Sequence, residues 1–225
     1  MISVIVPVFN REIYLREALE SILHQTRPAD EIIVIDDGST DRSADVARSF
    51  GQSVRCISQP NMGIGAARNA GLAAAQGNLI AFLDSDDLWV KNKLEIQSAF
   101  LQAHPELDLV FCKMKPFLSP ELSPGDIPAF DDRELAACVC SGLLAHRRAF
   151  DRAGGFETNL RVGEFVSWFE RAQAGGLRFE TLPELLLKRR VHRGNSVNDH
   201  GAKVDYLRLL KRRIDRRRAT GEVKA

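Results

Sequence analysis

Three carboxylates stand within four residues, at Asp84, Asp86 and Asp87. Carboxylates this close repel one another unless a cation or hydrogen-bond donors neutralise them. Mg²⁺ and Mn²⁺ suit such a group, because they take oxygen ligands and share them with phosphates and water. This DXD-type acidic turn therefore predicts a divalent cation held jointly with a diphosphate. The alternative is a solvated cap on a helix expected over residues 88–100.

Two other ligand motifs fail on inspection. Counted from Asp84, a calcium loop needs a ligand and a glycine at positions five and six, where the chain has Leu88 and Trp89. Residues 63–68 begin like a dinucleotide fingerprint, but Arg68 stands where a small third residue is required. The sequence also lacks a GxxxxGK phosphate loop. These departures exclude an EF-hand and disfavour dehydrogenases and P-loop enzymes.

Buried strands must position the acidic turn. Residues 2–8 and 31–35 are β-branched apolar runs, typical of strands covered on both faces. Apolar residues at helical spacing lie between them, so the two strands should be parallel. Weaker patterns predict strands over residues 53–58 and 79–83, and a helix over residues 39–50.

This alternation predicts an open, mainly parallel α/β sheet flanked by helices over the first 104 residues. Ligands bind such sheets beyond the carboxyl ends of the strands. Phe9 and Asn10 follow the first predicted strand, Asp36 and Asp37 follow the second, and the acidic turn follows the fourth. We therefore expect these three segments to meet in one crevice.

The regular pattern ends near residue 105. Residues 116–132 contain several prolines and predict a loop, whereas residues 135–150 and 165–174 predict helices with glycine breaks. Residues 203–225 carry an excess of basic residues beside an apolar stripe. This tail is expected to be a helix packed on the domain, with contact to an anionic membrane surface as the alternative.

Overall charge and hydropathy narrow the class of protein. Lys and Arg total 31 against 30 Asp and Glu, so the net charge of +1 does not favour nucleic acid as a partner. No apolar run approaches the roughly 18 residues needed to cross a bilayer, and the first residues lack the pattern of a signal peptide. We expect a cytoplasmic protein, with peripheral membrane contact through the tail as the alternative.

Five segments in order closely resemble family 2 glycosyltransferases, which have the GT-A type nucleotide-diphospho-sugar transferase fold. They are residues 4–10 (VIVPVFN), 34–41 (VIDDGSTD), 61–63 (NMG), 67–71 (ARNAG) and 82–87 (FLDSDD). Later segments match the family more thinly, and they are residues 154–157 (GGFE), 183–184 (PE) and 192–195 (HRGN). The resemblance is therefore dense over about the first 100 residues.

The resemblance implies an inverting enzyme that moves a sugar from a nucleoside diphosphate, with a UDP-sugar favoured, and uses Mn²⁺ or Mg²⁺. Residues 1–104 would bind the donor, and residues 105–202 would bind the acceptor and complete catalysis. Asp86 would be the principal metal ligand, and His192 would approach the metal or diphosphate. The implied nucleotide-sugar contacts are Pro7, Phe9, Asn10, Asp36, Asp37, Asn61, Arg68, Asp84 and Ser85.

The sequence departs from the family where a general base is expected. Many members have Glu-Asp after a glycine, whereas this chain has Gly163, Glu164 and Phe165. Glu164 is the candidate base, with apolar neighbours such as Phe165 and Trp168 tuning its carboxylate. Alternatively, Glu164 only stabilises the first turn of a helix. A noncatalytic nucleotide-sugar-binding protein of the same fold is the alternative function, and a glycan, lipid-linked sugar, peptide or small molecule all remain open as acceptors.

Overall fold

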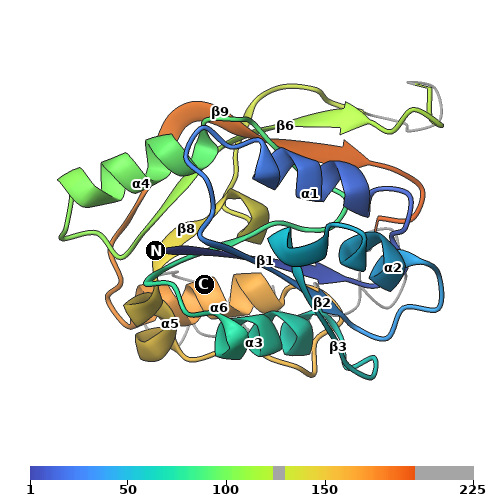
Figure 1. Cartoon of the computed structure of the whole chain (residues 1–225). Coiled ribbons are helices and arrows are strands. Elements are labelled where there is room, and N and C mark those ends of the chain that lie inside the picture. Colours follow the sequence, from blue (N-terminus) through green and yellow to red (C-terminus); the bar gives the residue numbers. More distant parts are fainter. Residues whose placement is uncertain (124–129, 196–225) are drawn as a thin grey trace, which may run out of the picture.

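The computed structural model describes residues 1–123 and 130–195. Within these residues, nine strands form one sheet in the order β3-β2-β1-β4-β8-β6-β9-β5, with β7 beside β6. Helices cover both faces of the sheet, with α1, α2 and α4 on one face and α3, α5 and α6 on the other (Figure 1). The basic tail predicted over residues 203–225 lies outside the described residues.

The first half of the chain is a parallel α/β unit, as predicted. Its strands are β1 (Ile2–Val8), β2 (Glu31–Asp36), β3 (Arg55–Ser58) and β4 (Leu79–Phe82). Its helices are α1 (Leu15–Leu23), α2 (Ser43–Arg48) and α3 (Ile64–Ala74), with a 3-10 turn at Gly51–Ser53. The pairs β1–β2, β1–β4 and β2–β3 are all parallel. Every residue of β1 is buried, which requires helices on both faces.

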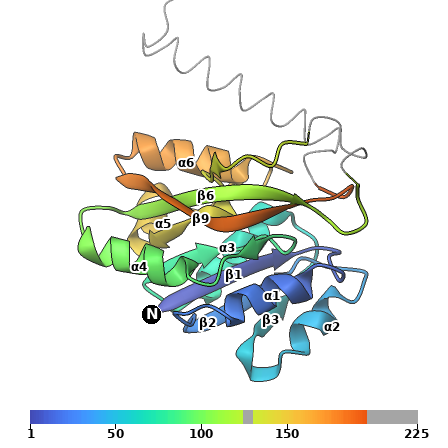
Figure 2. The same ribbon diagram turned by 90° about the horizontal axis from the view of Figure 1, so that it is seen from above.

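The second half makes the sheet mixed. Its elements are β5 (Leu88–Trp89), α4 (Lys93–Ala103), β6 (Leu109–Leu118), β7 (Leu135–Ala136), a 3-10 turn (Cys140–Gly142), β8 (Leu144–His146), α5 (Arg147–Ala153), α6 (Glu164–Ala174) and β9 (Phe179–Val191). Strand β8 is antiparallel to both β4 and β6, whereas β6 and β9 are parallel. These two long strands run side by side across the molecule (Figure 2).

Several predicted boundaries were wrong. The helix expected over residues 135–150 is replaced by two short strands and a turn, and only α5 is helical there, because the fully buried Leu144 and Ala145 fill the sheet between β4 and β6. The helix expected from residue 88 begins at Lys93, because Leu88–Trp89 pairs with β9.

Two further errors concern loops and helix starts. The loop predicted from residue 116 begins only after Leu118, because β6 continues along β9. Strand β9 itself was not predicted, and Pro183 lies where its register with β6 shifts, as expected for a residue that cannot donate to a ladder. The helix expected from Ser39 or Thr40 begins at Ser43, whose backbone N–H donates to Asp41 at 2.9 Å.

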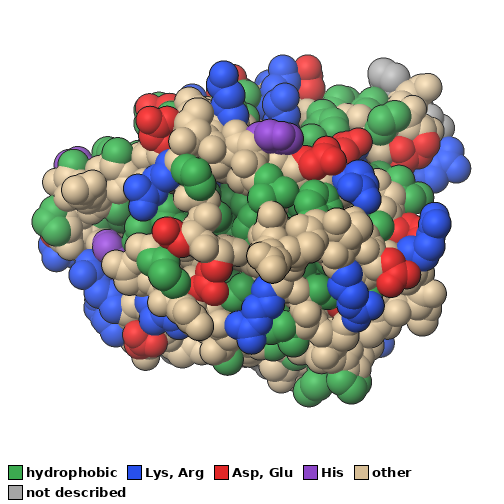
Figure 3. Space-filling model, in the orientation of Figure 1, with side chains coloured by type: hydrophobic (Ala, Val, Ile, Leu, Met, Phe, Trp, Pro, Cys, Tyr) green, Lys and Arg blue, Asp and Glu red, His purple; other side chains and the backbone are tan. Residues whose placement is uncertain are grey.

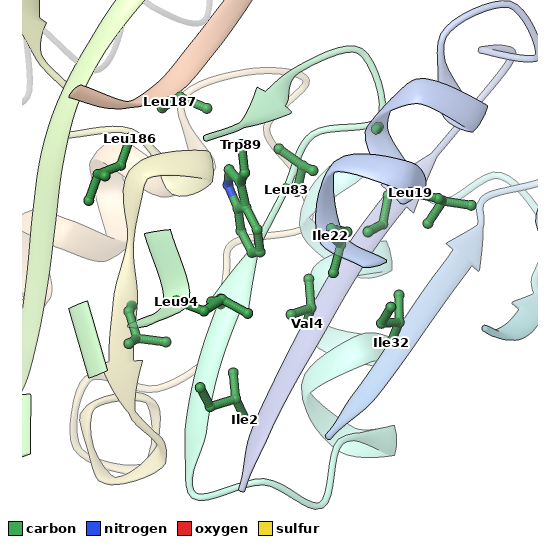
Figure 4. Packing of buried hydrophobic residues seen from close by; sticks show 14 of the residues in the cluster. Ile2, Val4, Leu19, Ile22, Ile32, Leu83, Trp89, Leu94, Leu186 and Leu187 are labelled. Carbon is green, nitrogen blue, oxygen red and sulfur yellow. The ribbon is translucent and has the colours of Figure 1, made fainter. Parts of the chain in front are cut away.

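Two hydrophobic cores hold the sheet between its helices. In the first, side chains of β1 and α1 pack with Trp89, Leu94 and Leu187 (Figure 4). The second is rich in aromatic rings and includes Phe82, Phe156 and Trp168. Because these cores fix the central strands on both faces, the carboxyl ends of β1, β2 and β4 are held at one edge of the sheet.

The surface carries charges of both signs. Basic and acidic side chains are interspersed over the face shown in Figure 3, in keeping with the net charge of +1. Among the described helices, none combines the length and hydropathy that a membrane span requires.

Candidate active site

A cleft of about 550 Å³ opens at the carboxyl ends of the parallel strands. Its walls come from the segments that follow β1, β2 and β4, from the start of α3, from the segment that precedes α6, and from the end of β9. The predicted site residues that line it are Pro7, Phe9, Asp37, Asn61, Arg68, Asp84, Ser85, Asp86 and Glu164. The structure thus brings together residues more than 150 positions apart in the sequence.

Asn10 and Asp36 were expected in the site but do not line the cleft. Asn10 has a φ of 52°, in the left-handed region that asparagine tolerates. Its side-chain oxygen accepts a hydrogen bond from the Thr40 backbone N–H at 2.8 Å. The buried Asp36 accepts one from the Ser39 N–H at 3.1 Å. Both residues therefore shape the loop after β2, beside the cleft.

Asp37 faces the cleft and also organises the loop that precedes α3. Its carboxylate accepts hydrogen bonds from the Gln59 side chain at 2.7 Å and from the backbone N–H groups of Met62 and Gly63 at 2.9 and 2.8 Å. The same loop carries Asn61 into the cleft. Loss of Asp37 should therefore disturb this wall as well as remove a carboxylate.

Arg68 connects the two halves of the cleft. It projects from α3 and is only 2% exposed, although it carries a full charge. One terminal nitrogen donates to Asp84 at 2.6 Å, and the other forms an ion pair with Glu164. Burial opposes the charge, but these carboxylates raise the pKa of Arg68 above its usual value. Both terminal groups are thus occupied by the protein's own carboxylates.

Asp86 is the centre of a second charged group. Its Oδ2 atom lies 2.9 Å from Nε2 of His192 and 3.4 Å from Nε of Arg11. Burial alone would raise the pKa of Asp86, but the His192 hydrogen bond and the positive Arg11 hold it below its usual value. His192 does not line the cleft, and lies in contact with Asp86.

The tautomer of His192 follows from its other ring nitrogen. The backbone N–H of Gly194 donates to Nδ1 at 3.1 Å, so in the neutral ring Nδ1 is the acceptor and Nε2 carries the proton donated to Asp86. For Nε2 to bind a cation, that proton must leave and the Gly194 hydrogen bond must break. Asp86 needs no such change.

The donor set therefore fits Mg²⁺ or Mn²⁺ through Asp86 first and His192 second. Such ions typically use one or two carboxylates and complete their coordination with phosphates and water. The described residues contain no cluster of three or more His, Cys, Asp and Glu side chains that could hold a metal ion. Asp84, whose side chain is 35% exposed, lies in the same turn.

Asp87 is the least solvated carboxylate of the acidic turn. Its pKa is raised well above the usual value, first by burial and then by the charges of Asp86 and Asp84. The backbone N–H of Arg190 donates to it at 3.0 Å, which offsets part of this effect. The contribution of Asp86 and Asp84 to this raised pKa is in keeping with the repulsion expected among the three carboxylates.

Glu164 and Phe165 lie in different environments. Glu164 is the first residue of α6, follows Gly163 in a left-handed conformation, and lines the cleft at 5% exposure. Phe165 is buried in the aromatic core and stacks on Trp168 at 5.8 Å between ring centroids. Within this segment, Glu164 is therefore the carboxylate that faces the cleft.

Sequence reasoning missed three arginines that line the cleft, namely Arg11, Arg161 and Arg189. Arg11 contacts Asp86, and its position directly after the strand-end motif of residues 7–10 was a usable signal. Arg189 also lines the cleft, near Asp87. It lies on β9, which the sequence pattern did not reveal, so nothing local indicated it.

Comparison with known proteins identifies the family. Residues 3–129, more than half of the chain, match the model described as Glycosyl transferase family 2. The chain belongs to this glycosyltransferase family. It is similar to an uncharacterized glycosyltransferase of Rickettsia typhi, at 30% identity over 213 residues that cover 88% of this chain and 66% of the relative. It also resembles glycosyltransferase GlyA of Streptococcus pneumoniae, at 47% identity over 93 residues that cover 40% and 13%. This family 2 chain thus spans less than two thirds of the length of each of these relatives.

Solved structures confirm the GT-A fold of this family 2 chain. TarS 1–349 of S. aureus in complex with UDP-GlcNAc superposes with a TM-score of 0.74 at 24% identity, covering 88% of this chain and 60% of that one. Mannosyltransferase PcManGT of Pyrobaculum calidifontis, in complex with GDP-Man and Mn²⁺, gives 0.67 at 22% identity, with 88% and 59% covered. At these identities the likeness establishes the fold.

Proposed function

We propose that this chain is an inverting, metal-dependent glycosyltransferase that takes its sugar from a nucleoside diphosphate, with a UDP-sugar favoured. The observation that carries the proposal is the composition of the cleft. An exposed aromatic ring, an acidic turn and a cleft-facing glutamate meet at the carboxyl ends of parallel strands. The complexes of TarS with UDP-GlcNAc and of PcManGT with GDP-Man support this class of donor.

The donor would occupy the side formed by the first half of the chain. Phe9 lines the cleft and is 44% exposed, so its ring is available to stack on the base, with Pro7 beside it. Asp37 and Asn61 would direct hydrogen bonds to the base or ribose. Asp84 and Ser85 would contact the ribose or donor sugar, since they lie on the turn between this wall and the acceptor side.

The diphosphate would lie against Asp86. A Mg²⁺ or Mn²⁺ ion held there, with His192 as a second ligand after its tautomer changes, would neutralise charge on the departing diphosphate. The protein's own contribution is a carboxylate kept ionised by Arg11 and His192. PcManGT, which was solved with Mn²⁺, supports this choice of ion.

Glu164 would accept the proton of the acceptor. Arg68 occupies Oε1 of Glu164 and leaves Oε2 to receive a proton. In an inverting reaction the acceptor oxygen attacks the anomeric carbon from the face opposite the diphosphate. Arg68 also contacts Asp84, so it sets the spacing between donor and acceptor sides. We therefore assign Arg68 a positioning role rather than the phosphate contact expected from the sequence.

A calorimetric panel of nucleotide sugars tests the proposal. UDP-, GDP- and dTDP-sugars would each be titrated with and without Mn²⁺, followed by assays of released nucleoside diphosphate with glycan, lipid-linked, peptide and small-molecule acceptors. We expect a UDP-sugar to bind and Mn²⁺ to strengthen the binding. Absence of binding by every donor would refute the function, and binding unchanged by a chelator would refute the metal role alone.

The second candidate is a noncatalytic nucleotide-sugar-binding protein. It is favoured by the burial of Phe165 in the core and by the ion pair that holds Glu164. It predicts donor binding without release of nucleoside diphosphate, whether an acceptor is present or absent. Acceptor-dependent turnover would exclude it.

A further inference from the structure

Arg190 is a buried charged residue outside the cleft. It is 2% exposed, and its guanidinium lies 5.0 Å from the ring centroid of Tyr14 and 4.7 Å from that of Phe117. One terminal nitrogen donates to Glu17 at 2.5 Å. A buried guanidinium is tolerated only when it is paired and hydrogen-bonded, and these contacts meet that requirement.

Two further contacts of Arg190 go to the acidic turn. Its Nε donates to the backbone carbonyl of Asp86 at 3.0 Å, and its own backbone N–H donates to the carboxylate of Asp87 at 3.0 Å. These bonds join β9 to the turn across more than 100 residues. Because consecutive residues of the turn are held from the same side, the direction of the Asp86 carboxylate is restricted.

Arg190 also influences His192 through Tyr14. The Tyr14 ring that contacts the guanidinium lies 4.6 Å from the imidazole ring of His192, and the Tyr14 hydroxyl donates to Glu121 at 2.5 Å. His192 in turn contacts Asp86. The backbone carbonyl of Arg190 further accepts a hydrogen bond from Asn195, which holds the backbone N–H of His192 at 2.6 Å. The Arg190 side chain thus contacts the backbone of Asp86 directly and the ring of His192 through Tyr14, whereas its backbone makes the bonds to Asp87 and Asn195.

We propose that Arg190 is a positioning residue that holds Asp86 and His192 in their common geometry, with Tyr14 carrying its effect to the imidazole ring. The inference deepens the proposed function, since it rests on Asp86 and His192 acting on the donor diphosphate. Substitution of residues that contact and orient metal ligands typically lowers metal affinity or activity by about 10- to 100-fold.

Arg190→Met tests this role, with Arg147→Met as the matched control. Arg147 also joins distant backbone segments, donating to the carbonyls of Gly77, Leu72 and Ala75, but it lies at the amino end of β4 and does not line the cleft. We expect both variants to lose stability. Only Arg190→Met should lose about 10- to 100-fold in donor turnover and in Mn²⁺ affinity measured by calorimetry. Arg190→Lys should restore part of both.

A readout independent of activity comes from the ring nitrogens of the five histidines. In protein labelled with ¹⁵N-histidine, the His192 signals are assigned with His192→Gln. We expect Arg190→Met to shift them, and Arg147→Met to leave them in place. If Arg190→Met does not fold, Tyr14→Leu serves instead, because it removes the ring that links the two residues.

Unmoved His192 signals in the folded variant would overturn the proposal, as would a turnover equal to that of Arg147→Met. If the parent protein turns over no donor, the proposed function fails separately. The histidine spectra then decide the role of Arg190 by themselves.

Discussion

Arg68→Met tests whether this buried arginine of the cleft serves mainly to bridge Glu164 and Asp84 or to bind phosphate. The Arg68 side chain is 3% exposed and lies between Glu164, at 6%, and Asp84, at 35%. Removing one partner of a buried ion pair typically lowers the free energy of unfolding by about 3 to 5 kcal/mol, because the other charge is left uncompensated. The Asp84 pair is partly exposed and adds at most about 1 kcal/mol. We therefore expect a loss of about 4 kcal/mol, which comes mainly from Glu164.

Chemical denaturation measures this loss, and a double-mutant cycle assigns it. Glu164→Leu removes the buried carboxylate and leaves Arg68 paired with Asp84, so it should be less damaging than Arg68→Met. The double variant should recover at least about 2 kcal/mol relative to Arg68→Met, which is within the range of coupling between contacting residues. Arg16→Met, at an exposed arginine of α1, is the control and should stay within about 0.5 kcal/mol of the parent.

One result would refute this reasoning. If Arg68→Met unfolds within about 1 kcal/mol of the parent and loses affinity for UDP, the carboxylate bridge is not its main role. Arg68 would then be a phosphate-binding arginine, as the sequence pattern suggested.

Four further predictions concern the cleft and the core. Asp86→Ala should abolish Mn²⁺-dependent turnover and, because it leaves Arg11 and the buried His192 without their partner, should also lower the unfolding midpoint; normal activity in the folded variant would refute its metal role. Glu164→Gln should lower acceptor-dependent turnover by about 10² to 10⁴ with donor affinity preserved, whereas a change of a few-fold would make Glu164 structural. Asp37→Ala should weaken donor binding by about 1 to 3 kcal/mol in calorimetry, and unchanged binding would show that the nucleotide does not bind beside Asp37. Burial lowers the pKa of Lys93 to about 8. The folded protein then releases this proton before the unfolded chain does, so its stability relative to Lys93→Met should rise by about 2 kcal/mol from pH 8 to 10, and a flat difference would contradict the shift.

The parallel half of the fold was readable because its signals are local. Strands β1 and β2 are buried on both faces, so nearly every position is apolar and the run stands out in the sequence. The polar residues that end these strands mark the sheet edge where ligands bind. The sequence pattern therefore predicts the location of the cleft, and Phe9, Asp37 and Asp84 line its walls in the structure.

The mixed half was misread because its pattern depends on distant partners. Strand β9 mixes buried, half-buried and exposed positions without regular alternation and contains Pro183, so no strand pattern stands out in its sequence, and it is its pairing with β6 that defines it. Residues 135–150 contain an apolar stretch that suits a buried strand or a helix equally well. Its position between β4 and β6, with which it pairs, is what makes part of this stretch the strand β8.

The family, the strand-end location of the cleft and the acidic turn can all be read from the sequence, because each is encoded in contiguous residues. The pairing of charges follows only from the folded arrangement. Arg68 pairs with Glu164 across 96 positions and Asp86 with His192 across 106, and these contacts depend on how α6 and β9 pack against the parallel half. The type of a side chain indicates that its charge needs a partner. Which residue becomes that partner depends on how segments far apart in the sequence pack together. For this reason Arg68, which looked like a phosphate ligand in the sequence, is bound to two carboxylates in the folded protein.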